Sequence, residues 1–306
     1  MGFSSFSSDA YDALKTDYST KSTDDIFTSN RNRKPIDEML PKDIKFREAR
    51  DSEEHPTSLA IAVFLDETGS MGDIPEYLVK NKLGILIQTL IDHGIEHPSV
   101  LFGAIGDHIS DSYPLQVGQF ESGTEELDKW LTGMYLEGYG GGQDMESYLL
   151  AWLFASRHTT IDCFEKRKEK GFLFTIGDEK SWGKLDANYL KELMGYAQAD
   201  SVSDKQLLAE AQKVYNVYHI HINETGYRDD PNVLGYWRDI LGERLIILDD
   251  KELVAEIIAS TVGIMHGITL EKMTADFDPK VALAVSNAIS HLSSSKLDSD
   301  KGTIKL

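Results

Sequence analysis

The sequence predicts an α/β fold: a doubly wound, mostly parallel sheet with helices on both faces and one antiparallel edge strand. Continuous apolar runs of strand length recur along the chain, as is typical of strands buried on both faces. Segments with apolar residues at helical spacing separate these runs. Because parallel strands need long crossover connections, and helical crossovers pack on the faces of the sheet, this alternation indicates the fold class.

The first half of the predicted sheet comes from residues 59–120. Residues 59–65, Leu-Ala-Ile-Ala-Val-Phe-Leu, form the first central strand. A helix follows from Pro75, a residue that suits a first helical turn, and its apolar spacing ends at Gly94. Residues 100–105 form the next strand, and residues 115–120 return beside it after a turn-rich segment. This hairpin predicts the antiparallel edge.

The alternation continues to residue 265. Helical spacing predicts helices at residues 124–136, 146–156, 186–196, 203–215, 234–241 and 251–265. Apolar runs predict strands at residues 171–176, 217–222 and 244–248. We therefore expect five or six strands in one domain.

Two polar flanks lie outside this alternation. Residues 1–55 are rich in Ser, Thr, Asp, Lys and Arg, which predicts an extended or conditionally ordered arm outside the core. Residues 56–268 form the predicted domain. Residues 269–306 hold a predicted helix at 278–292 and then a polar tail.

The charge balance argues against nucleic acid as a partner. Lys and Arg number 31 against 51 Asp and Glu, so the formal net charge is -20 and the chain repels phosphate backbones. The same excess of carboxylates suits hard cations where several of them meet in space.

The lack of a recognisable secretory signal or membrane-spanning segment predicts a cytoplasmic protein that is not bound to a membrane. The amino-terminal residues lack a basic region followed by an apolar core, and no apolar run approaches the roughly 20 residues needed to span a bilayer. Cys163 is the only cysteine, which excludes an internal disulfide and agrees with a reducing compartment.

Three of the predicted strands are followed by an Asp. Asp66 follows the strand at 59–65, Asp107 the strand at 100–105, and Asp178 the strand at 171–176. Ligands of open α/β sheets bind at the carboxyl ends of the strands, so we expect these side chains to converge. Asp107 could instead cap a turn.

The loop after the first strand adds further oxygen ligands. Thr68 and Ser70 supply hydroxyls at alternating positions after Asp66, and Gly69 and Gly72 let the backbone turn tightly. Two hydroxyls and one or two carboxylates suit Mg²⁺, which binds about six oxygens and leaves an open position here. The carboxylate of a partner can fill that position.

The segment Asp66-Glu67-Thr68-Gly69-Ser70 resembles the DxSxS or DxTxS signature of the metal-ion-dependent adhesion site of von Willebrand factor A (VWA) domains. The resemblance covers residues 56–268 and implies that Asp66, Thr68 and Ser70 bind a divalent metal, Mg²⁺ in preference to Mn²⁺ or Ca²⁺. It also implies a contribution from Asp178, which follows a later strand.

One segment departs from the VWA pattern. These domains usually place a Thr in a Gly-rich loop between the two motifs, whereas this chain has Gln143 at that position and Asp144 next to it. Either residue could ligate the metal, and a second anionic ligand would weaken the attraction of the cation for an acidic partner. Glu146 could face the metal, but a cap on the first turn of the following helix is the favoured interpretation.

Other motifs do not fit. Thr68 stands where a GxSxG nucleophile motif needs Gly, and the Gly-rich segment at 138–142 lacks the GK[ST] ending of a phosphate-binding loop. His219 and His221 share one face of a strand without a third ligand at suitable spacing, so we expect structural histidines.

The sequence therefore predicts a metal-dependent protein-binding module rather than an enzyme. In this hypothesis Mg²⁺ bridges the site to an Asp or Glu of a partner protein. The resemblance to intracellular VWA proteins implies that a MoxR-type AAA+ ATPase could be that partner. The alternative is a structural subunit of a larger assembly that uses its two flanks. A Mg²⁺-dependent hydrolase is the least favoured of the three.

Overall fold

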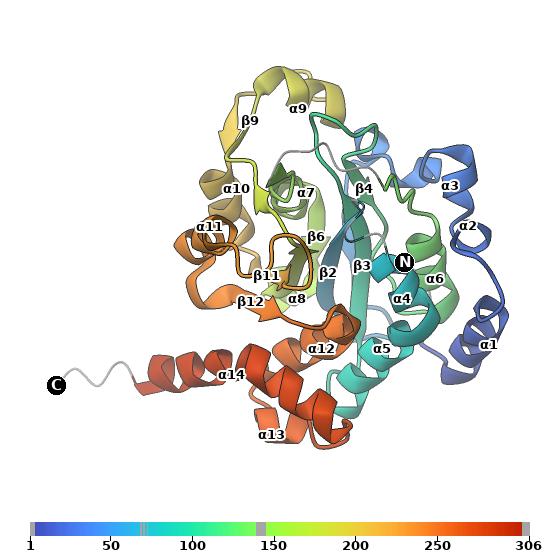
Figure 1. The fold of residues 1–306 in the computed structure, drawn as a ribbon, viewed down its shortest axis with the longest axis vertical. Helices are drawn as coiled ribbons and strands as arrows, with labels where there is room; N and C mark the ends of the chain where they lie inside the picture. Colours follow the sequence, from blue (N-terminus) through green and yellow to red (C-terminus); the bar gives the residue numbers. More distant parts are fainter. Residues whose placement is uncertain (1–3, 68, 70, 72, 139–144, 302–306) are drawn as a thin grey trace.

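The computed structural model describes residues 4–67, 69, 71, 73–138 and 145–301, with side chains described up to Leu292. Its centre is a six-stranded sheet in the order β12-β11-β7-β2-β3-β4 (Figure 1). These strands are β2 (Leu59–Asp66), β3 (Pro98–Ile105), β4 (Leu115–Val117), β7 (Gly171–Gly177), β11 (Tyr215–Ile222) and β12 (Leu245–Leu248). All residues of β2, β3 and β7 are buried, as their continuous apolar runs predict.

The strand order places β2 at the middle of the sheet. Strand β3 pairs with one side of β2 and strand β7 with the other, both in parallel. From β2 the chain therefore adds β3 and β4 on one side, and later adds β7, β11 and β12 on the other side. Strand β4 pairs antiparallel with β3 and forms the edge. The predicted α/β class and the mostly parallel sheet with one antiparallel edge are confirmed.

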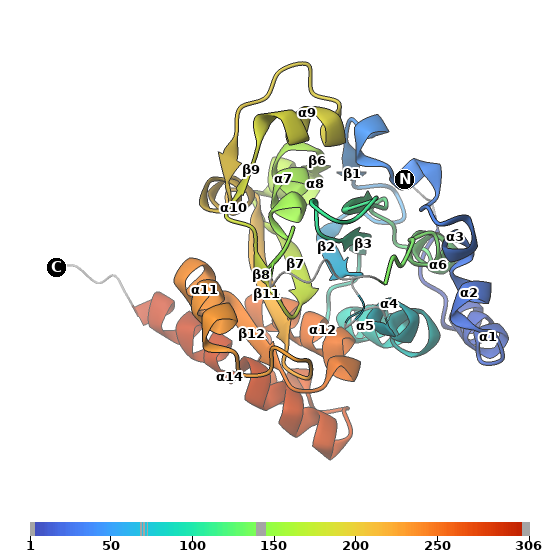
Figure 2. The ribbon, with the colours of Figure 1, turned by 45° about the horizontal axis from the view of Figure 1, so that its top comes forward.

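Helices pack around this sheet. Helices α5 and α12 contact each other on one side, and helices α7 and α10 contact each other on the other side (Figure 2). The α-helices are α1 (Ser8–Tyr18), α2 (Thr23–Ile26), α3 (Thr28–Asn32), α4 (Asp73–Tyr77), α5 (Leu83–Asp92), α6 (Thr124–Thr132), α7 (Leu149–Arg157), α8 (Asp162–Arg167), α9 (Ala187–Met194), α10 (Asp204–Ala211), α11 (Pro231–Leu241), α12 (Val254–Met265), α13 (Leu270–Met273) and α14 (Pro279–Lys301). A π-helical turn, η3 (Leu78–Lys82), joins α4 to α5.

The amino-terminal segment packs against the domain, which differs from the expected arm outside the core. Its apolar side chains join the main hydrophobic core through Tyr11, Tyr18, Ile26, Phe27, Met39, Ile44 and Ala49. The Tyr18 hydroxyl also donates a hydrogen bond to Asp128 of α6 at 2.8 Å. These apolar residues are scattered among polar ones in short helices, so they form no period that the sequence would reveal.

Three short strand pairs were not expected from the sequence. They are β1 (Arg47–Ala49) with β6 (Thr159–Ile161), β5 (Met145–Glu146) with β8 (Lys180–Ser181), and β9 (Lys184–Leu185) with β10 (Val202–Ser203). Strand β5 takes up the start of the helix predicted at 146–156, which therefore begins at Leu149.

The carboxyl-terminal helix α14 is longer than the helix predicted at 278–292. Val285, Ile289 and Leu292 bury one side of it, and it packs beside α12. Among the described residues, no helix is both long enough and apolar enough to cross a membrane.

Candidate metal site

Asp66, Asp107 and Asp178 lie at the same edge of the sheet. Asp66 ends β2, Asp107 follows β3 by two residues and Asp178 follows β7 directly. The three strands are parallel neighbours, so their carboxyl ends meet. Each of the three side chains is 1% exposed. The structure thus brings together the strand-end residues that the sequence singled out.

The other predicted metal ligands, Thr68, Ser70, Gln143 and Asp144, lie outside the described residues. Among the residues that are described, no group of three or more His, Cys, Asp or Glu side chains is arranged to hold a metal ion. The complete predicted ligand set is therefore a proposal, taken up below.

Asp66 is bound by a tyrosine that the sequence did not indicate. The hydroxyl of Tyr148 donates a hydrogen bond to Oδ2 of Asp66 at 2.6 Å, and Tyr148 is fully buried. Burial raises the pKa of Tyr148, and the negative charges of Asp66 and Asp178 raise it further. The phenol therefore keeps its proton and acts as a donor.

Glu146 is a buried carboxylate at this site and does not cap a helix. It is 2% exposed, and α7 begins only at Leu149, without a side-chain cap. Burial raises the pKa of Glu146 to about 11, with the charge of Asp66 as the next cause. Among the described residues, Oε2 of Glu146 has no hydrogen-bond partner. Without a nearby cation the group therefore keeps its proton at neutral pH.

Glu67 is a second buried carboxylate that the sequence did not single out. Its side chain is fully buried and accepts a hydrogen bond from the amide of Gln116. Burial raises the pKa of Glu67 well above its ordinary value, and Asp111 adds a further repulsive charge.

The carboxylate of Asp107 is held by hydrogen bonds within the protein. Its Oδ1 accepts from the backbone of Ile109 at 3.1 Å and from the Trp182 indole at 2.8 Å. Its Oδ2 accepts from the Ser110 hydroxyl at 3.0 Å. These are the bonds of a turn-capping residue, the alternative that the sequence left open.

His219 and His221 are both fully buried, as expected of structural histidines. Burial lowers the pKa of His219 well below its ordinary value and that of His221 to about 4, so both rings are neutral. His219 stacks on Trp237 with 3.5 Å between ring centroids and shares a hydrogen bond with Thr175 at 2.9 Å.

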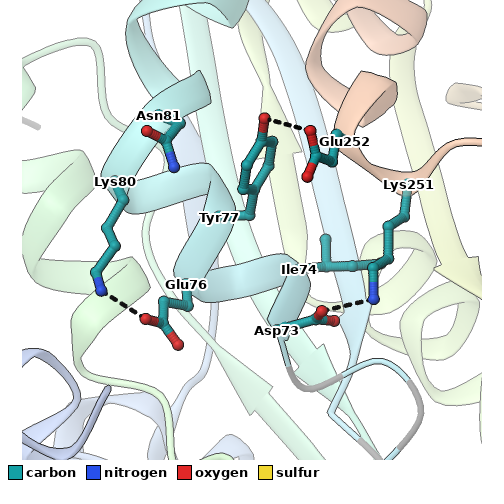
Figure 3. A pocket seen from close by; sticks show the side chains of 8 residues that line it. All are labelled: Asp73, Ile74, Glu76, Tyr77, Lys80, Asn81, Lys251 and Glu252. Atoms are coloured by element: carbon teal, nitrogen blue, oxygen red, sulfur yellow. Dashed lines mark hydrogen bonds and ion pairs between the residues drawn. The ribbon is translucent and has the colours of Figure 1, made fainter. Parts of the chain in front are cut away.

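A cavity of about 250 Å³ lies where α4 begins (Figure 3). Its charged groups pair with one another across it. The Lys251 ammonium contacts Asp73 at 2.5 Å, and the Tyr77 hydroxyl donates to Glu252 at 2.9 Å. The cavity thus separates α4 from the turn before α12, and these two contacts connect them.

Comparison with known proteins leaves the family open. No protein-family model matches the chain, and no characterised protein matches it in sequence. The pilus adhesin SpaC of Lactobacillus rhamnosus GG in its open conformation is similar over 70% of this chain and 31% of its own, at 10% identity and a TM-score of 0.41. A second form of SpaC is similar over 71% of this chain and 32% of its own, at 10% identity and a TM-score of 0.43. Proximal thread matrix protein 1 of the mussel byssus is similar over 66% of this chain and 46% of its own, at 8% identity and a TM-score of 0.38. The chain thus spans less than half the length of each.

Proposed function

We propose that this chain is a VWA-like, metal-dependent protein-binding module. A divalent metal, Mg²⁺ in preference to Mn²⁺ or Ca²⁺, is held at the carboxyl edge of a doubly wound sheet and binds a carboxylate of a partner protein. The metal ligands are Asp66, Thr68, Ser70 and Asp178, with Gln143 or Asp144 and Asp107 as further candidates.

One observation carries the proposal: Asp66 and Asp178 follow neighbouring strands at the place where the strand order reverses. Strand β2 lies between β3 and β7, and the chain changes its direction across the sheet there. Open α/β sheets bind their ligands in this position. The signature beginning at Asp66 supplies hydroxyl ligands in the same loop.

The donor set fits a hard cation. The described groups at this edge are the carboxylates of Asp66, Asp107 and Asp178, and the sequence of the loop after Asp66 adds hydroxyls. Carboxylates and hydroxyls are oxygen ligands of the kind that Mg²⁺ and Ca²⁺ prefer. Asp66, Glu146 and Asp178 are buried, and their negative charges act on the same Tyr148 phenol. A bound cation would offset this repulsion and would coordinate the partner carboxylate through its open position.

The partner is proposed to be an intracellular protein with an exposed Asp or Glu, with a AAA+ ATPase of the MoxR type as one candidate. The net charge of -20 disfavours nucleic acid. The alternative of a structural subunit needs two free flanks that contact neighbouring subunits. Apolar residues of the amino-terminal flank pack in the core of its own domain, which disfavours this alternative.

A capture experiment tests the proposal. Wild type and Asp66→Ala are each immobilised with Mg²⁺ and with EDTA, and retained proteins are identified. We expect a partner that is retained only by wild type with Mg²⁺. Asp128→Ala is the control, since the carboxylate of Asp128 lies on α6 and accepts a hydrogen bond from the Tyr18 hydroxyl of the amino-terminal segment at 2.8 Å. A partner retained equally in all conditions would contradict the metal bridge.

A further inference from the structure

We infer that Tyr148 is the positioning residue of the metal site: it fixes the carboxylate of Asp66, and Gly177 provides the space that this contact needs. The inference rests on the proposed function, because it takes Asp66 as a metal ligand. It concerns the hydrogen bond behind the ligand, which tunes how a ligand is presented to its metal.

The hydrogen bond joins two buried groups. The Tyr148 hydroxyl lies 2.6 Å from Oδ2 of Asp66, and the two residues are 0% and 1% exposed. A bond to a charged acceptor is stronger than one between neutral groups and restricts the rotation of the carboxylate. Tyr148 thereby decides how Asp66 faces the loop that follows it.

Gly177 is required where the phenol reaches Asp66. A Cβ atom on this residue would lie 1.9 Å from the Tyr148 hydroxyl and 2.7 Å from Oδ2 of Asp66. Both distances are far below van der Waals contact, so a side chain at position 177 would displace the hydroxyl. Strand β7 thus ends in the one residue type that admits the contact.

The ring of Tyr148 is confined by aromatic neighbours. It makes edge contacts with His219 and Trp237, at centroid distances of 5.0 and 5.5 Å. Both neighbours are fully buried, and their rings stack on each other. The phenol therefore has little freedom to turn away from Asp66.

The backbone around Tyr148 is tied to two further loops of the site. Ser147 accepts a hydrogen bond from the backbone of His108, in the loop after β3, at 2.9 Å. The backbone of Leu149 donates to Ser181, after β7, at 3.2 Å. Together with the bond to Asp66, these contacts make residues 147–149 the point where the loops after β2, β3 and β7 meet.

The test compares Mn²⁺ binding by the full chain in wild type, Tyr148→Phe and Tyr215→Phe, by calorimetry and by the electron paramagnetic resonance spectrum of bound Mn²⁺. Tyr215 is a matched control, because it is fully buried and its hydroxyl bonds Thr159 at 2.6 Å, at the other end of β11. We expect Tyr148→Phe to weaken Mn²⁺ binding about 10-fold or more and to change the spectrum. Both substitutions remove a buried hydroxyl and should lower the melting temperature to a similar degree. Tyr215→Phe should nevertheless leave the Mn²⁺ affinity and the Mn²⁺ spectrum unchanged.

A second variant approaches the same contact from β7. Gly177→Ala should weaken Mn²⁺ binding at least as much as Tyr148→Phe, because its methyl group displaces the hydroxyl; it decides the question if Tyr148→Phe does not fold. A variant that folds and binds Mn²⁺ like wild type, with the same spectrum, would overturn the inference and leave the proposed function standing. Wild type that binds no Mn²⁺ would overturn both.

Discussion

Two buried carboxylates, Asp162 and Glu146, lie at opposite ends of the central strands and have opposite surroundings. Asp162 is 3% exposed and contacts Arg50 at 2.8 Å and Lys166 at 2.6 Å. Its Oδ2 accepts a hydrogen bond from the backbone of Asp51, and the carboxylate of Asp51 accepts one from the hydroxyl of Ser58, just before β2. Glu146 is 2% exposed, and the largest charge effects on it come from other carboxylates, with Asp66 first.

The pKa values of the two groups show what this difference does. Burial alone would raise the pKa of Asp162, but the hydrogen bonds from Lys166 and Arg50 outweigh it and lower the pKa to about 2. Burial raises the pKa of Glu146 to about 11, and the neighbouring carboxylates add to the rise. A buried carboxyl group therefore keeps its charge where cationic partners outweigh the effect of burial, as at Asp162, and loses it where other carboxylates add to that effect, as at Glu146. The amino end of the sheet carries its own cations, Arg50 and Lys166, whereas the described carboxyl groups around Glu146 at the carboxyl end raise its pKa.

The largest effect is expected at the amino end, where removing a cation leaves carboxylates behind. Arg50→Met should lower the free energy of unfolding by about 3 kcal/mol, because Asp162 stays buried with one partner fewer. Urea unfolding at pH 7 measures the change. Arg31→Met is the control, since Arg31 pairs with Asp25 on the surface and should contribute less than about 1 kcal/mol. Equal losses in the two variants would remove the distinction between buried and exposed pairs.

The carboxyl end should respond in the opposite direction. At pH 7 the raised pKa of Glu146 means that this side chain must take up a proton when the protein folds. Glu146→Gln keeps the shape of the side chain without this cost, so in EDTA it should raise the free energy of unfolding by about 1 to 2 kcal/mol. The matched control is Glu256→Gln, which removes the buried partner of Lys82 and should destabilise the protein. Destabilisation by both substitutions would mean that Glu146 has a stabilising partner and would contradict the comparison.

The sheet was predictable because its signal is local. The run at 59–65 and its neighbours are apolar at every position, and such runs fix strand and burial together. The segment at 4–55 gave no such signal: Phe27 and Met39 are fully buried, yet each belongs to a short apolar pair between polar stretches, and only the surface of the finished domain provides their partners. A pattern search cannot find contacts that depend on the rest of the fold.

The site divides in the same way. The strand-end rule identified Asp66, Asp107 and Asp178 because strand ends can be read from the chain. Tyr148 was not identified, and Glu146 was assigned to a helix cap, since the two-residue strand pair that precedes α7 has no periodicity. Their residue types alone are equally common on a helix or at the surface.

The smallest expected effect comes from an intermediate case, Asp128. This carboxylate has a hydroxyl donor, Tyr18, at 2.8 Å, and burial raises its pKa to about 6. A raised pKa favours the protonated folded state, so this stabilisation is complete below about pH 4 and is lost as the pH rises through 6. Asp128→Asn keeps an acceptor for Tyr18 and removes the charge. It should match wild type in stability near pH 4 and exceed it by about 1 kcal/mol above pH 7. Chemical unfolding across this range measures the difference, and a difference that is constant with pH would show that a hydroxyl donor alone compensates the buried charge.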